Sequence, residues 1–204
     1  MTNVFNADEP DTSTSINNLC TQPAIFSIQY ALVQLWKRAG ISPDYVLGHS
    51  IGEYCAAYIA GVFSLEDVVK LVANRARLMN SVSDAGAMLA VRAELPNLSL
   101  YLDKYADSVS VAALNGPSGC VISGAASDIE QISTALAEAG INTQPLAVSQ
   151  AFHSPLMEGV LEPFLKVATE VQYKLPGLPF VSTVSGQIET SLLTCLLYTS
   201  DAAD

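Results

Sequence analysis

The hydrophobic positions in the first part of the chain recur with the period of a helix. From Pro23, a favourable first residue of a helix, apolar side chains return at helical spacing until Gly40, which is typical of a helix end. These apolar positions are Phe26, Tyr30, Val33 and Trp36. The pattern predicts a helix over residues 23–39.

A strand and two further helices follow in the pattern. A short apolar strand is predicted over residues 45–49 and a helix over 51–60. Ser64 and Asp67 resemble a capping box, with Asp in place of the usual Glu, and predict another helix that runs to about Asn80. Because helices and strands alternate, we expect an α/β core with a mainly parallel sheet.

Between about residues 86 and 148 the pattern changes to shorter elements. The predicted strands are 87–91, 109–114, 119–123 and 142–148, and the predicted helices are 95–105 and 127–139. This β-α-β-β-α-β order is the ferredoxin-like arrangement, whose ends lie close together and so suit insertion into another domain. The turn Asn115–Ser118 would join the two central strands as a slightly long hairpin. We therefore expect a core at 21–85 and 149–190, with an inserted subdomain at 86–148.

The segment Val46–Tyr54 reads as a strand, a turn containing a serine, and the start of a helix. Ser50 stands in a G-x-S-x-G pattern, in which Gly48 and Gly52 allow the strand and the helix to approach closely. This nucleophile elbow exposes the serine Oγ at a helix N-terminus. The backbone N–H of Ile51 can there stabilise a developing oxyanion. The pattern indicates acyl transfer through a serine.

A serine nucleophile needs a base, and the chain has two histidines. His49 adjoins the serine, and the backbone of an elbow directs its ring away from Oγ. His153, in the segment AFHSPLM, is therefore the favoured base.

The predicted helix at 65–80 places Arg75 on its apolar side. Val68, Leu71, Val72 and Met79 share that stripe. Arg77 falls on the polar face instead, as a solvated charge. A guanidinium in apolar surroundings is costly unless paired, so Arg75 either has a buried carboxylate partner or binds an anionic ligand. The residues alone favour the ion pair within the protein over the anionic ligand. If the ligand is a carboxylate, the guanidinium can bind it bidentately.

Composition excludes several other classes of function. The formal net charge is −11, with nine Lys and Arg residues, which argues against nucleic-acid binding. The most hydrophobic stretch, Tyr54–Phe63, is too short to cross a bilayer. No basic segment followed by an apolar run opens the sequence, so we do not expect a secreted protein. The cysteines are scattered without a C-x-x-C pair, and they are Cys20, Cys55, Cys120 and Cys195. We expect a cytoplasmic protein that has no metal site.

With these motifs the chain resembles the malonyl-CoA:acyl carrier protein transacylase family, and most closely the acyltransferase domains of modular (type I) polyketide synthases. The resemblance runs from about Thr21 to Gly186. The matching segments, in family order, are TQPAIFSIQYAL, GHSIGEY, AGVFSLEDVVKLVANRARLM, VAALNGPSGCVISG, AFHSPLM and FVSTVSG. It implies a hydrolase-like α/β core that carries a ferredoxin-like insert.

The resemblance also implies a role for each candidate residue. Ser50 would be the nucleophile, His153 the base, and Arg75 the group that binds the free carboxylate of malonyl-CoA. The implied reaction is ping-pong: the acyl group passes from CoA to the serine and then to the phosphopantetheine thiol of an acyl carrier protein. It requires no tightly bound cofactor. Flanking synthase domains, a ketosynthase among them, are the other implied partners.

The residues just before the catalytic histidine track the extender unit in this family. Ala151 and Phe152 resemble the malonyl form rather than the Tyr-Ala-Ser-His form of methylmalonyl enzymes, and the Phe152 ring would fill the space that an α-methyl group needs. His49 and Asn115 are the other residues assigned to this pocket by the resemblance.

Departures from the family define two alternatives. The polar lead-in at 1–20 lacks the family's opening strand and Gly-Gln-Gly loop, and the tail at 191–204 resembles no part of the family, so we expect a domain truncated at both ends. An inactive domain with binding or packing roles is one alternative. The other is an α/β-hydrolase-type thioesterase or esterase, which needs an acid between the serine and the histidine. Four aspartates that satisfy this order all lie in or beside the insert, which argues against a triad; they are Asp84, Asp103, Asp107 and Asp128.

Overall fold

The computed structural model describes residues 18–189, apart from residues 84, 149 and 184. Within this part the chain divides into two compact units, one formed by 18–81 and 162–189 and the other by 82–161. The predicted domain bounds of 21–85, 149–190 and 86–148 remain predictions. Most of the predicted lead-in and the whole predicted tail lie outside the described residues.

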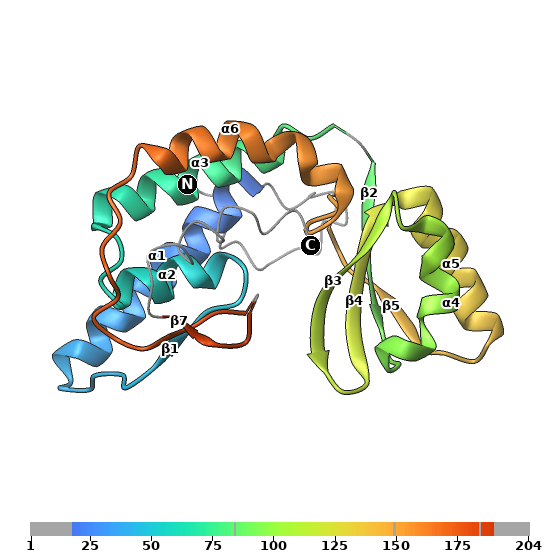
Figure 1. Cartoon of the computed structure of the whole chain (residues 1–204), viewed down its shortest axis with the longest axis horizontal. Coiled ribbons are helices and arrows are strands. Elements are labelled where there is room, and N and C mark those ends of the chain that lie inside the picture. Colours follow the sequence, from blue (N-terminus) through green and yellow to red (C-terminus); the bar gives the residue numbers. More distant parts are fainter. Residues whose placement is uncertain (1–17, 84, 149, 184, 190–204) are drawn as a thin grey trace, which may run out of the picture. The chain divides into compact units, whose positions relative to one another are not determined.

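The first unit combines helices with a small mixed sheet. Its helices are α1 (Asn18–Arg38), α2 (Ile51–Ile59), α3 (Leu65–Asn80) and most of α6 (Glu158–Thr169), and its strands are β1 (Val46–Leu47), β6 (Phe180–Val181) and β7 (Ile188–Glu189). Strand β6 lies between the other two, parallel to β1 and antiparallel to β7. Figure 1 shows β1 leading through a short turn into α2. The elements predicted at 45–49, 51–60 and 65–80 are thus present, with the strand shorter than expected.

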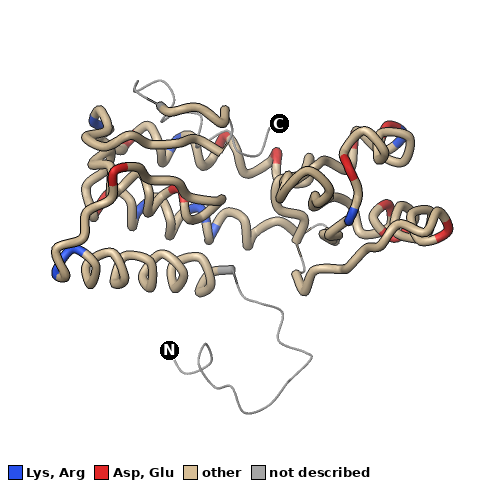
Figure 2. Tube along the Cα trace, turned by 90° about the horizontal axis from the view of Figure 1, so that it is seen from below, with Lys and Arg blue, Asp and Glu red and all other residues tan. Residues whose placement is uncertain are grey.

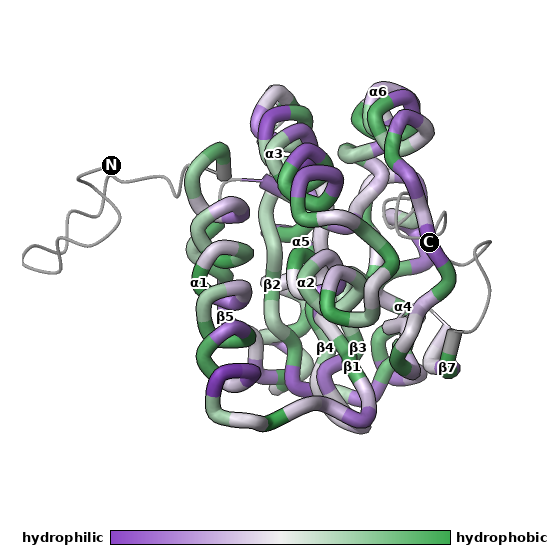
Figure 3. Tube along the Cα trace, turned by 90° about the vertical axis from the view of Figure 1, so that its left-hand side faces the viewer, coloured by the Kyte–Doolittle hydropathy of each residue, from purple (hydrophilic) through white to green (hydrophobic). Residues whose placement is uncertain are grey.

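Helix α1 begins at Asn18, five residues before the proline that the sequence pattern takes as its start. A proline inside a helix removes one backbone hydrogen bond, so local preference does not predict the turn before it. That turn has tertiary contacts, because the Gln22 side chain accepts a hydrogen bond from Arg75 at 2.6 Å. Only some of the apolar residues at the predicted helical positions are buried: Phe26 is 4% exposed, whereas Trp36 is 56% exposed. Hydrophobic positions (green) accordingly recur along α1 in Figure 3.

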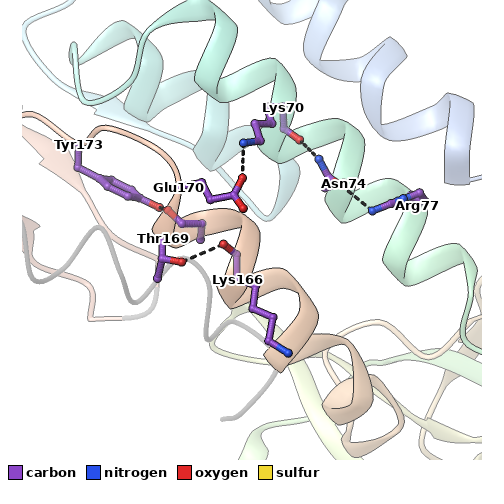
Figure 4. Close-up of polar contacts among 8 residues, drawn as sticks. Lys70, Asn74, Arg77, Lys166, Thr169, Glu170 and Tyr173 are labelled. Carbon is purple, nitrogen blue, oxygen red and sulfur yellow. Dashed lines mark hydrogen bonds and ion pairs between the residues drawn. The ribbon is translucent and has the colours of Figure 1, made fainter.

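Helix α3 follows its sequence signals closely. Ser64 is the N-cap, and its Oγ accepts a hydrogen bond from the Asp67 backbone N–H at 3.0 Å. The predicted apolar stripe is buried along its length, and its members are Val68, Leu71, Val72, Arg75 and Met79. Arg77 is exposed and donates to Asn74, as Figure 4 shows. The two arginines therefore lie on the different faces that helical periodicity predicts.

Helices α3 and α6 are joined at their surface by an ion pair. Lys70 Nζ lies 2.6 Å from Glu170 Oε2, just beyond the end of α6 (Figure 4). An exposed pair of this kind contributes at most about 1 kcal/mol. The larger contribution comes from one apolar cluster beneath, to which α1, α2, α3, α6 and the sheet contribute. Its buried members include Phe26, Tyr54, Val68, Leu71, Val72, Phe164, Ala168 and Phe180.

The second unit is a four-stranded antiparallel sheet with helices on one face (Figure 1). Its strands are β2 (Gly86–Val91), β3 (Val109–Gly116), β4 (Gly119–Ala125) and β5 (Thr143–Pro145), and its α-helices are α4 (Ser99–Leu102) and α5 (Ala126–Glu138). The strand order β3-β4-β2-β5 places the first strand between the third and the fourth. This is the ferredoxin-like topology, so the predicted β-α-β-β-α-β order is correct. Its separate core includes Leu89, Leu98, Ile122, Ile129, Ile132 and Leu136.

Three elements of this unit differ from the prediction. The expected helix at 95–105 is divided into two 3₁₀ turns and the short α4, because hydrogen bonds such as Leu98 N–H to the Leu95 carbonyl close three-residue turns. The strand predicted at 142–148 ends at Pro145, which lacks a backbone donor and is tolerated here because β5 is an edge strand. The β3–β4 hairpin is tighter than expected, since Gly116 pairs with Gly119.

The N-cap of α3 makes the first testable prediction. Ser64→Ala removes the acceptor for the Asp67 amide and should lower the free energy of unfolding by about 1 kcal/mol. Ser64→Thr, which keeps an acceptor oxygen, should retain most of the stability. The measurement is the urea midpoint of each variant at constant m-value. Equal midpoints for Ser64→Ala and the wild type would show that the cap contributes nothing to stability.

Candidate active site

Ser50 lies in the turn between β1 and α2, with a backbone conformation that few residues other than glycine adopt. Its φ is 49° and its ψ is −117°. Such a conformation costs on the order of 1–3 kcal/mol and persists only where the surrounding structure enforces it. The sharp turn reverses the chain between strand and helix, as a nucleophile elbow requires. The expected elbow geometry is therefore present at this serine.

Gly48 makes the close turn possible. A Cβ atom at Gly48 would lie 2.2 Å from the backbone carbonyl carbon and oxygen of Gly52, too close for any side chain. The strand and the first turn of α2 therefore pack backbone against backbone. This contact is the physical reason for glycine at position 48, as the spacing of the motif predicts.

The N-terminus of α2 presents a backbone donor beside the serine. In the described part of the chain the Gly52 and Glu53 amides donate to the carbonyls of His49 and Ser50, both at 2.9 Å, whereas the Ile51 amide has no backbone acceptor. An amide at a helix N-terminus favours negative charge near it. The Ile51 N–H is thus available for the predicted oxyanion role, which remains a prediction.

Arg75 reaches the serine from α3. The residue is 7% exposed, and its Nη2 lies 3.2 Å from Ser50 Oγ. Its Nη1 donates to Gln22 Oε1 at 2.6 Å, and the guanidinium carbon lies 5.8 Å from the centre of the Tyr54 ring. Both hydrogen-bond partners among the described residues are neutral. The sequence alone favours an ion pair between Arg75 and a carboxylate of the protein. These two contacts are hydrogen bonds to neutral groups instead.

A buried carboxylate supports the same turn, and the sequence pattern did not single it out. Glu53 is 3% exposed, in the first turn of α2, and accepts hydrogen bonds from the backbone N–H and the hydroxyl of Thr183, beyond β6. The contact joins the elbow helix to the loop that follows the parallel partner of β1. The sequence does carry a signal for this buried carboxylate, because an acidic residue within the apolar run of α2 needs a hydrogen-bonding partner when it is buried.

His153 belongs to the second unit, in the loop that precedes α6. It has a φ of 57°, the only described residue besides Ser50 that combines a side chain with positive φ. Its carbonyl accepts a hydrogen bond from the Ser110 hydroxyl on β3. Ala151, two residues before the histidine, lies so close to Gly86 that a Cβ atom on Gly86 would be 2.4 Å from the Ala151 backbone nitrogen. Two strands of the second unit thus hold the histidine loop, through residues that the sequence analysis did not identify.

The other predicted pocket residues lie in different surroundings. In the second unit, Ala151 is buried, Phe152 is half-buried and Asn115 is exposed near the end of β3. In the first unit, His49 is exposed and lines an apolar cavity of about 710 Å³ between α1, β1 and α2. Neither Ser50 nor Arg75 is among the residues that line this cavity. The assignment of these residues to a specificity pocket remains a prediction.

Ser50 and His153 belong to different units, so their pairing rests on the resemblance. Of the acids considered for a hydrolase triad, Asp84 lies outside the described residues. Asp103 and Asp107 are exposed in the second unit, and the Asp128 carboxylate accepts a hydrogen bond from the Ser108 hydroxyl at 2.6 Å.

The described residues contain no candidate metal site, and two of their cysteines are buried. Among residues 18–189, leaving out 84, 149 and 184, no group of three or more His, Cys, Asp or Glu side chains could hold a metal ion. Burial raises the pKa of the Cys55 and Cys120 thiols, which keeps them protonated and unreactive at neutral pH. The basic positions are scattered along the trace rather than gathered in a patch (Figure 2). No helix of the described part is long and apolar enough to cross a membrane.

Comparison with known proteins identifies the family. The model of the family described as "Acyl transferase domain" matches residues 2–196, a range that extends beyond the resemblance of residues 21–186 at both ends. The chain is 44% identical over 174 residues to a phenolphthiocerol synthesis polyketide synthase type I of Mycobacterium marinum. The match covers 83% of this chain and 8% of that synthase.

Solved structures agree with this result. The acyltransferase domain from the second module of the salinomycin polyketide synthase matches with a TM-score of 0.84 and 44% identity, over 90% of this chain and 43% of that one. A malonyl-transacylase solved in complex with its type II polyketide synthase acyl-carrier protein gives a TM-score of 0.85 at 28% identity, over 91% of this chain and 62% of that one. The α/β fold with its ferredoxin-like subdomain is thereby confirmed, and the chain belongs to the acyl transferase domain family.

Proposed function

We propose that this chain transfers a malonyl group from CoA to the phosphopantetheine thiol of an acyl carrier protein through an acyl-Ser50 intermediate. One observation carries the proposal: a buried guanidinium with neutral hydrogen-bond partners donates to the hydroxyl of the elbow serine. An acyltransferase that handles only neutral acyl chains has no use for a buried cation at this place. A substrate with a free carboxylate would supply the missing anion.

The dimensions of malonyl fit this arrangement. In a malonyl-serine ester the free carboxylate is joined to the ester carbon through a single methylene, by bonds of about 1.5 Å each. The carboxylate therefore stays within a few ångströms of Ser50 Oγ. Arg75 already donates a hydrogen bond to this atom, at 3.2 Å. A planar guanidinium can then bind both carboxylate oxygens.

The reaction has two half-reactions with one set of groups. His153 accepts the Ser50 hydroxyl proton as Oγ attacks the thioester carbonyl, and the Ile51 amide stabilises the oxyanion of the tetrahedral intermediate. Cleavage of the C–S bond releases CoA, which takes the proton from His153. The carrier thiol then gives its proton to His153 and attacks the serine ester, and Ser50 recovers its proton as it leaves.

The partners are part of the proposal. The acyl-carrier protein complex of the matching malonyl-transacylase supports a carrier as acceptor. The chain covers 8% of the length of its polyketide synthase relative, which supports action beside other synthase domains, a ketosynthase among them. The proposed chemistry uses no metal ion and no tightly bound cofactor, since phosphopantetheine arrives on the carrier.

Incubation with malonyl-CoA should give one malonyl adduct, which peptide mass mapping places on Ser50. Ser50→Ala should abolish it, and His153→Gln should slow its formation by at least about a hundredfold, the usual effect of removing a general base. The measurement is intact mass against time. An adduct that persists in Ser50→Ala would contradict the proposed nucleophile.

Removing the guanidinium should affect malonyl more than acetyl. Arg75→Gln is expected to lower malonyl loading by about ten- to a hundredfold, the effect of losing charge-assisted hydrogen bonds, with a much smaller effect on acetyl-CoA loading. Arg77→Gln is the matched control, because that arginine is exposed on the same helix and donates to Asn74. Equal losses with both thioesters would exclude a carboxylate-binding role.

The choice of extender provides a separate test. Phe152→Ser should raise the ratio of methylmalonyl to malonyl loading by about ten- to two-hundredfold, since space for one methyl group is worth about 1–3 kcal/mol. Competition between the two CoA esters, read by adduct mass, measures this ratio. An unchanged ratio would show that the half-buried Phe152 does not limit the pocket.

A further inference from the structure

Gln22 is a buried polar side chain to which the sequence motifs assign no role. It is the fifth residue of α1, just before Pro23, and is 6% exposed. Its Oε1 accepts the hydrogen bond from Arg75 Nη1 at 2.6 Å, and its Nε2 donates to the Met79 sulfur at 3.4 Å. Both contacts reach residues of α3, more than fifty positions along the chain.

The two contacts fix which end of the amide faces the arginine. A guanidinium has only donors, so it requires the amide oxygen, and the thioether sulfur, a weak acceptor, suits the amide nitrogen. Neither contact is possible with the amide reversed. One nitrogen of the guanidinium is thereby held, while the other points to the serine hydroxyl at 3.2 Å.

The charge of the partner decides what the arginine can still bind. A carboxylate at this position would accept the same hydrogen bond and would also neutralise the guanidinium. An amide holds the guanidinium with the same geometry and leaves its charge uncompensated. Only an uncompensated cation retains a strong attraction for an incoming anion in low-dielectric surroundings.

We propose that Gln22 is a positioning residue, which orients Arg75 toward Ser50 while leaving its positive charge free for the carboxylate of the substrate. This inference rests on the proposed function. It assigns selectivity for diacid thioesters to the pair of Gln22 and Arg75 rather than to the arginine alone.

The test compares an isosteric change of charge with a change that only removes the acceptor. Gln22→Glu should pair with Arg75 and lower the ratio of malonyl to acetyl loading, measured as kcat/KM by adduct mass, by at least about tenfold, mainly through a higher KM for malonyl-CoA. Gln22→Met keeps the length of the side chain without a charge, and should lower the ratio less. Gln34→Glu, on the same helix, adds the same charge and should leave the ratio at its wild-type value.

Two results in this comparison would overturn the proposal. One is an unchanged ratio in Gln22→Glu. The other is an equal fall in Gln22→Met and Gln22→Glu, which would show that the side chain acts by packing and not by its neutrality.

A titration that does not depend on catalysis separates this proposal from the proposed function. In Gln22→Glu labelled with ¹³C at the glutamate carboxyls, the added resonance should titrate well below the ordinary glutamate pKa of about 4.3, because Arg75 stabilises the charged form. In the double variant Gln22→Glu, Arg75→Gln that depression should be lost. If the wild type forms no malonyl-serine, the proposed function fails, yet this titration still decides whether residue 22 holds the arginine. An ordinary pKa in the single variant would overturn the contact.

Discussion

The first unit is organised around one buried cation. Arg75 extends from α3 and donates to Gln22 on α1 and to Ser50 at the start of α2, so a single side chain links these helices at the serine. A buried guanidinium is costly unless its donors find acceptors, and here the protein supplies an amide oxygen and a hydroxyl as acceptors for two of them. These contacts thus connect the start of α1, the entry into α2 and the buried face of α3. It also leaves the charge itself without a counter-ion in these contacts.

The serine turn is a second constraint, and it depends on contacts beyond the motif. The backbone at Ser50 is strained, and Gly48 permits the turn because its lack of a side chain lets the strand meet the backbone of the helix. The absence of a steric clash does not by itself keep a residue in a strained conformation, which persists only where surrounding contacts enforce it. Glu53, buried in the first turn of α2, accepts two hydrogen bonds from Thr183 and so fastens the helix to the loop after β6. The motif supplies the shape of the turn, and a contact 130 residues away stabilises it.

Sequence patterns predicted the features of the structure that depend on residues close together in the chain. The cap at Ser64, the buried face of α3 and the order of elements in the second unit follow from side chains within a few positions of each other. The elements that differed depend on distant partners or on backbone chemistry. The early start of α1 involves the hydrogen bond that Arg75 donates to Gln22, 53 positions away. The short β5 reflects a proline at the edge of the sheet. For the same reason the motifs identified Ser50, His153 and Arg75 but not Gln22, Glu53, Gly86 or Ser110.

A neutral partner for a buried arginine has a thermodynamic consequence. A glutamate at position 22 would offer the guanidinium a charge-assisted hydrogen bond, roughly twice as strong as a neutral one, from the same place in the helix. The chain has an amide there, and so it forgoes part of the stabilisation available to a buried ion pair. Residues at functional sites are often retained at such a cost, because the more stable alternative removes the property that binding requires. An arginine paired with a carboxylate of the protein has a structural role, whereas the amide at position 22 leaves the charge of Arg75 for the anionic ligand that we propose.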